Sequence, residues 1–137
     1  MSFSSSHLLR QLDRPEPVHA VAPPENGRET YAFLIAMLGR PELNVNQNFN
    51  GVHVLFRIRS FGKREEVLDK FAELATHPKL EVRSEAFKMA VGLVKFSLMS
   101  ERNPLILSER QEQNLRGAIQ SGLTLKATRL ARDFFTG

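Results

Sequence analysis

Asn50-Gly51 stands between two segments with alternating residues, and this pattern constrains the fold more than any other in the chain. Apolar residues occupy nearly every second position from Leu43 to Phe49, and again from Val52 to Ile58. Asn-Gly between such segments is a strong hairpin signal, because both central residues of a type I′ turn need a positive φ. The sequence therefore predicts a β-hairpin over residues 43–59.

The two-residue turn also fixes which residues face each other across the predicted hairpin. It pairs Phe49 with Val52 and Val45 with Phe56, on a face that is nearly all apolar. The opposite face carries Asn and cationic side chains. The competing interpretation is a helix over residues 52–59, because the apolar residues of this segment also fit helical spacing.

Apolar residues at helical spacing predict α-helices over 28–39, 64–76, 81–99, 109–120 and 123–135. The first is apolar all round and is expected to be buried. Ser108-x-x-Gln111 is a capping-box pattern at the start of the fourth. Residues 1–26 are rich in Ser and Pro and are expected to form a flexible tail, with a short helical turn around Leu8, Leu9 and Leu12.

The predicted fold class is mainly α (α+β). The tail precedes a single domain over residues 27–137. In this domain a buried helix leads into the β-hairpin, and a bundle of about four helices follows.

The predicted helix pair over residues 64–99 resembles a single HEAT-type repeat. The resemblance depends on Pro78, Val82, Arg83 and Ala86, in the pattern Pro-x-x-x-Val-Arg-x-x-Ala. It covers about a quarter of the chain, and the sequence contains no second copy. Because HEAT-type repeats stack into solenoids with extended binding surfaces, the resemblance implies a protein-docking surface.

The composition limits which cellular compartments and which kinds of metal site are expected for this chain. The chain has 137 residues and no Cys, which excludes disulfides and thiolate metal sites. Its longest apolar run, residues 31–38, is too short for a membrane span, and its start lacks the apolar core of a secretory signal. We expect a soluble, cytoplasmic protein without membrane contact. The Ser-rich, acid-free start is similar to leaders of bacterial secreted effectors, so a secreted effector is the alternative.

No catalytic motif stands out in the sequence. The four His residues do not share metal-ligand spacing, and no Gly-rich phosphate loop occurs. Glu66, Asp69 and Glu73 fall on one face of a predicted helix, where solvated carboxylates are expected. We therefore expect no enzyme, no cofactor, no metal and no small-molecule substrate.

Positive charge is concentrated after residue 50, where fifteen Lys and Arg accompany ten acids. Residues 51–64 hold four cations and no acid, with Phe56 and Phe61 among them. A two-stranded ribbon fits the DNA major groove, Arg pairs with guanine and Asn with adenine, and aromatic rings stack on single strands. The predicted nucleic-acid-binding residues are Asn44, Asn46, Asn48, His53, Arg57, Arg59, Lys63, Arg64, Lys126, Arg129 and Arg132.

The sequence thus predicts a non-catalytic basic accessory protein that contacts nucleic acid or a ribonucleoprotein. The plain alternative for the polar face is an ordinary solvated surface. The alternative function is a protein–protein interaction adaptor, or a secreted regulatory or effector protein, with a helical docking surface. Self-association belongs to this alternative, because the apolar arcs of 28–39 and 81–99 could exceed what one small domain covers.

Overall fold

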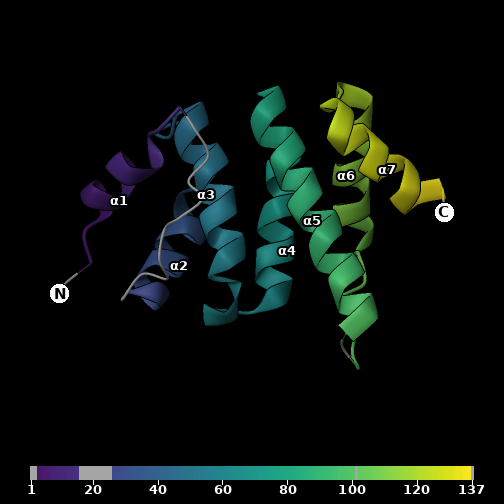
Figure 1. Cartoon of the computed structure of the whole chain (residues 1–137), viewed down its shortest axis with the longest axis horizontal. Helices are drawn as coiled ribbons and strands as arrows, with labels where there is room; N and C mark the ends of the chain where they lie inside the picture. Colours follow the sequence, from purple (N-terminus) through teal and green to yellow (C-terminus); the bar gives the residue numbers. More distant parts are fainter. Residues whose placement is uncertain (1–2, 16–25, 101, 137) are drawn as a thin grey trace. The chain divides into compact units, whose positions relative to one another are not determined.

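The computed structural model describes residues 3–15, 26–100 and 102–136, and all regular elements in these ranges are helical (Figure 1). They are α1 (Ser5–Leu12), α2 (Gly27–Met37), α3 (Val45–Arg57), the 3₁₀ turn η1 (Arg59–Phe61), α4 (Arg64–Leu74), α5 (Leu80–Ser100), α6 (Glu109–Ser121) and α7 (Leu125–Thr136). The chain divides into two compact units, Met1–Val67 and Leu68–Gly137, and the division falls inside α4. No helix in the described ranges is long and apolar enough to cross a membrane.

The predicted β-hairpin over residues 43–59 is wrong, and with it the β part of the predicted fold class. Residues 45–57 of this segment form α3, and the part of the chain that the structure describes contains no strand. Asn44 is the N-cap of α3: its side-chain oxygen accepts the Gln47 amide at 2.8 Å, and the Gln47 side chain accepts the Asn44 amide at 3.0 Å. This capping box satisfies amides that the first helical turn leaves without partners.

Asn50-Gly51 joins helices together instead of turning the chain. A Cβ at the buried Gly51 would collide with Cδ2 of Leu38, so the missing side chain lets α3 approach the end of α2. Asn50 Nδ2 donates to the carbonyl oxygens of Leu12 at 2.7 Å and Arg14 at 3.2 Å, which satisfies the C-terminal end of α1. Among the described residues, positive φ occurs only at Gly39 and Gly122.

The N-terminal unit has its core where α1 and α2 pack against α3. Its buried side chains include Leu8, Leu12, Leu34, Val52 and Leu55. The helix α1 occupies the place of the predicted helical turn in the tail segment, while residues 16–25 lie outside the described residues. The predicted helix over 28–39 is confirmed as α2, although its small Ala32 and Ala36 are exposed.

The C-terminal unit is built around α5, against which α6 and α7 pack. The predicted helices over 64–76, 81–99, 109–120 and 123–135 are confirmed as α4 to α7. Val82, Phe87 and Val91 on the apolar arc of α5 are buried, whereas Phe96 and Leu98 near its end are exposed. The predicted capping box at Ser108 and Gln111 is also present, with both reciprocal hydrogen bonds.

Candidate functional site

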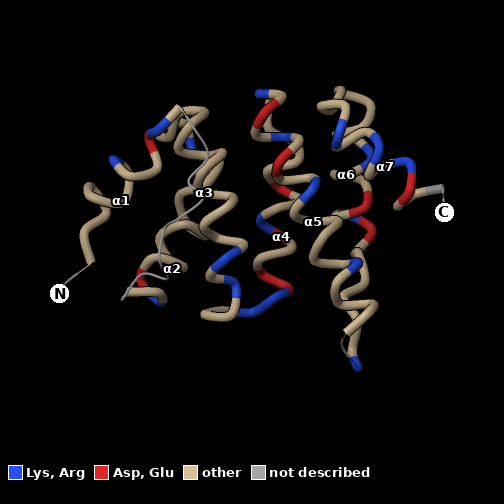
Figure 2. Tube along the Cα trace, in the orientation of Figure 1, with Lys and Arg blue, Asp and Glu red and all other residues tan. Residues whose placement is uncertain are grey.

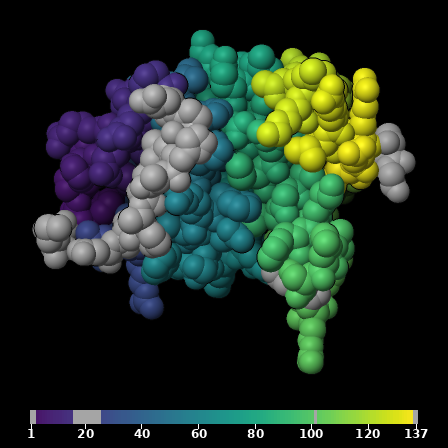
Figure 3. Space-filling view, in the orientation of Figure 1, coloured from purple at the N-terminus to yellow at the C-terminus, as the bar shows by residue number. Residues whose placement is uncertain are grey.

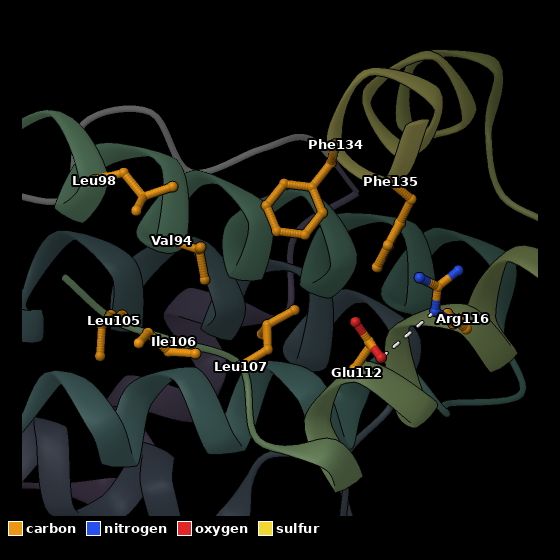
Figure 4. Close-up of a pocket in the computed structure, with 9 residues that line it drawn as sticks. All are labelled: Val94, Leu98, Leu105, Ile106, Leu107, Glu112, Arg116, Phe134 and Phe135. Atoms are coloured by element: carbon orange, nitrogen blue, oxygen red, sulfur yellow. Dashed lines mark ion pairs between the residues drawn. The ribbon is translucent and has the colours of Figure 1, made fainter. Parts of the chain in front are cut away.

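An apolar groove opens on the C-terminal unit between the end of α5, the segment before α6, and α7 (Figure 4). Its volume is about 390 Å³. The lining residues come from α5 (Val94, Leu98), the connecting segment (Leu105, Ile106, Leu107), α6 (Glu112, Arg116) and α7 (Phe134, Phe135). Seven of these nine side chains are apolar, so covering the groove with an apolar group of a partner would be favourable.

Ser97 holds the connecting segment in place beside α5. Its buried hydroxyl accepts the backbone N–H of Leu105 at 2.8 Å and donates to the Val94 carbonyl at 2.8 Å. The hydrogen bond from the Leu105 amide holds this residue against α5, and its side chain is buried in the core of the unit. The next residue, Ile106, then points outward and is 82% exposed at the groove.

The wall formed by α7 is an aromatic pair with a cation beside it. The rings of Phe134 and Phe135 meet edge to face, with centroids 4.9 Å apart. The Arg116 guanidinium carbon lies 4.4 Å from the Phe135 ring centroid, and Arg116 Nε lies 3.8 Å from a Glu112 carboxylate oxygen. This half-exposed ion pair contributes little to stability, but the ring contact orients the guanidinium at the groove.

Further large apolar side chains are exposed at the end of α5. Leu98 lines the groove and is 60% exposed, while Phe96 and Met99 on the same turns are also exposed. Figure 3 shows the green end of α5 with the following segment next to the yellow α7 on this unit. The apolar arc predicted for residues 81–99 thus continues past the point where the unit's own core covers it.

The first group of predicted nucleic-acid-binding residues lies at the start of α3 and within it, and two of its members have structural roles there. Asn44 caps the helix, and Asn48 is buried with its Oδ1 accepting the Gly39 amide at 2.7 Å at the end of α2. His53 is partly buried, with its ring 5.0 Å from that of Phe49, and Asn46 lies on the first turn of α3. The predicted polar face of a ribbon, which these four residues were to form with Arg57 and Arg59, therefore does not exist.

A second group lies at one corner of the N-terminal unit, where α3 ends, η1 turns and α4 begins (Figure 2). This basic corner consists of Arg57, Arg59, Lys63 and Arg64. The third group, Lys126, Arg129 and Arg132, is exposed on α7, where a spacing of three residues places them along one face. The second and third groups keep the positive surface that the sequence predicts, without the ribbon.

Structural causes account for the shifted pKa values of Tyr31 and His77. Burial, and then the hydrogen bond to Glu66, raise the pKa of Tyr31. Burial, with Lys79 and Arg83 nearby, lowers the pKa of His77, whose Nδ1 accepts the Lys79 amide at 3.1 Å. Within the described ranges, no group of three or more His, Asp or Glu side chains could hold a metal ion.

Helical periodicity does not predict the connecting segment that completes the groove. Its signal in the sequence is the apolar run Leu105-Ile-Leu107 between two helices, where a polar loop would be ordinary. Comparisons with family models, curated proteins and solved structures give no match to this chain. The resemblance of residues 64–99 to a HEAT-type repeat therefore stays a prediction.

Proposed function

We propose that this chain is a non-catalytic protein-interaction module whose C-terminal unit binds an apolar segment of a partner protein in the groove. One observation carries the proposal: Leu98 and Ile106 are 60% and 82% exposed at the edge of a groove lined by two Phe side chains. Contiguous exposed apolar surface is rare on a protein that needs no partner, and it marks interaction sites.

An amphipathic helix is the partner element that suits this groove best. The volume of about 390 Å³ lies at the small end of the range for ligand pockets, roughly 300–1,000 Å³, and gives room for a few apolar anchors. Helices that dock in grooves present such anchors at spacings of three and four residues. The guanidinium of Arg116 lies at the groove, with its carbon 4.4 Å from the Phe135 ring centroid, and only Nε contacts Glu112 in the ion pair at 3.8 Å. A carboxylate beside the apolar anchors of the partner helix therefore suits this position.

The test uses helical peptides selected from a displayed library against the full chain, followed by affinity measurements on single peptides. We expect selected peptides to share apolar residues at helical spacing with an adjacent acid. Ile106→Glu should weaken their binding at least about tenfold, because it places a charge among apolar contacts. Met99→Glu is the matched control, since Met99 is 87% exposed on the same part of α5 but does not line the groove.

Peptides that bind Ile106→Glu as tightly as the wild type would contradict the proposal, as would a selection that yields no helical binder. Sedimentation of the chain alone provides a second check. A dimer that Ile106→Glu dissociates and Met99→Glu leaves intact would identify a second copy as the occupant, in place of a different partner.

A further inference from the structure

The basic corner of the N-terminal unit combines its cations with an exposed aromatic ring. Phe61 lies in η1, between Arg59 and Lys63, and is 44% exposed. A Cβ at Gly27 would collide with the tip of the Phe61 ring, so the ring packs directly against the backbone of Gly27. The ring is thus held at one end while much of its surface faces solvent.

The Arg59 guanidinium is also held in position. Its carbon lies 4.2 Å from the centroid of the Phe56 ring, and Nη1 donates to the Phe56 carbonyl at 2.7 Å. Preorganisation of this kind lowers the entropy that the side chain loses when an anion binds. Arg57 and Lys63 are exposed on either side of η1 along the chain.

The two acids that follow the basic corner already interact with neighbouring groups. Glu66 accepts the Tyr31 hydroxyl at 2.7 Å, and Glu65 lies 3.2 Å from Nε of Arg64. Within residues 57–66 four cations therefore accompany two carboxylates, and both carboxylates are engaged within the unit. This local excess of positive charge favours an anionic partner.

We propose that the basic corner binds single-stranded nucleic acid, with a base stacked on Phe61 and phosphates contacted by Arg57, Arg59 and Lys63. A single strand offers both an open base face and a phosphate at each nucleotide, which matches a ring set among cations. An acidic protein would match the cations but would not require the exposed ring. This surface belongs to the N-terminal unit and is independent of the groove.

Fluorescence anisotropy of the full chain with a labelled oligouridylate tests the proposal. We expect binding at low salt. The logarithm of the association constant should fall with the logarithm of the salt concentration with a slope of about −2, for three phosphate contacts on a single strand. Arg57→Glu with Lys63→Glu should weaken binding at least about tenfold. The matched control, Lys126→Glu with Arg129→Glu, makes the same change of charge on α7 and should leave binding within about twofold of wild type.

Phe61→Leu separates stacking from simple attraction of charge, because Leu keeps an apolar contact for Gly27 and removes the ring. It should weaken binding about tenfold. Circular dichroism checks that each variant is folded, and Arg57→Gln with Lys63→Gln replaces the charge reversal if that variant unfolds. The proposal fails if the wild type does not bind, if Phe61→Leu binds as tightly as wild type, or if only the α7 variant loses binding.

Discussion

Nε of Arg83 donates to the carbonyl oxygen of Gly122 at 2.7 Å, and this bond ties the start of α5 to the turn between α6 and α7. The other guanidinium nitrogens donate to the carbonyls of His77 and Pro78 at 3.1 Å and of Ser121 at 3.4 Å. The buried charge thus lies among backbone carbonyls, two of them at the C-terminal end of α6, where the helix dipole favours a cation.

Arg83→Leu should therefore destabilise the protein strongly. The substitution removes the donor for four partly buried carbonyls. An unsatisfied polar group costs about 1–3 kcal/mol when it is fully buried, and less where water reaches it. We expect the free energy of unfolding, measured in urea, to fall by about 3 kcal/mol. Arg110→Leu on the exposed face of α6 is the control and should change it by less than about 0.5 kcal/mol. Equal stability of the two variants would show that the carbonyls do not depend on Arg83.

Gly51→Ala should also destabilise, although Ala is the better helix former. The new Cβ would meet Cδ2 of Leu38, a fully buried side chain that has little room to move. Overpacking of this kind costs about 1–3 kcal/mol, which exceeds the gain of roughly 1 kcal/mol from helix propensity. Gly117→Ala in α6 has open space around the added methyl group and should stabilise by about 0.5–1 kcal/mol. Thermal unfolding of both variants measures the contrast, and stabilisation by Gly51→Ala would contradict the close approach of α2 and α3.

Ser97→Ala tests how the groove is assembled. The substitution leaves the buried Leu105 amide without its acceptor, so we expect a loss of about 1–2 kcal/mol in the free energy of unfolding. Hydrogen exchange at the Leu105 amide should accelerate more than exchange in the centre of α5. Ser100→Ala removes a hydroxyl that bonds the Phe96 carbonyl on an exposed turn, and it should cost less than about 0.5 kcal/mol. Unchanged exchange at Leu105 in Ser97→Ala would mean that other contacts hold the connecting segment.

The contrast between α3 and the other helices shows which part of the fold the sequence reveals. In α5 the buried residues Val82, Ala86 and Phe87 follow helical spacing, so periodicity alone predicts the helix. In α3 the buried set includes Asn48 and Asn50, whose partners lie at the ends of α2 and α1. Buried polar residues break the apolar pattern of a helix, and their long-range bonds are invisible in local sequence.

One local signal for α3 was present in the sequence. Asn44 with Gln47 three residues later has the spacing of a capping box, as Ser108 with Gln111 has at the start of α6. The Asn50-Gly51 hairpin signal competed with it and pointed the other way. For the groove, periodicity predicts that Leu98 and Phe134 belong to apolar faces. It does not predict that the chain folds back at Leu105 and leaves Ile106 outside.

Tyr31 provides a direct test of the N-terminal unit, because it is the single tyrosine of the chain and the chain has no Trp. Its ring is buried, and its hydroxyl donates to Glu66 at 2.7 Å. Burial and this bond raise its pKa above the ordinary value of about 10. The folded state therefore keeps the proton that the unfolded state releases, so this contribution to stability is complete below about pH 10 and declines as the pH rises further.

We expect the near-ultraviolet absorbance of tyrosinate to appear at higher pH in the native protein than in urea. Tyr31→Phe should lower the free energy of unfolding by about 1 kcal/mol at neutral pH, through loss of the hydrogen bond to Glu66. Because Phe has no proton to release, the difference between wild type and variant should shrink as the pH rises above 10. The same titration midpoint in the native and unfolded protein would show that Tyr31 is neither buried nor bound to Glu66. It would also contradict the packing of α2 against η1.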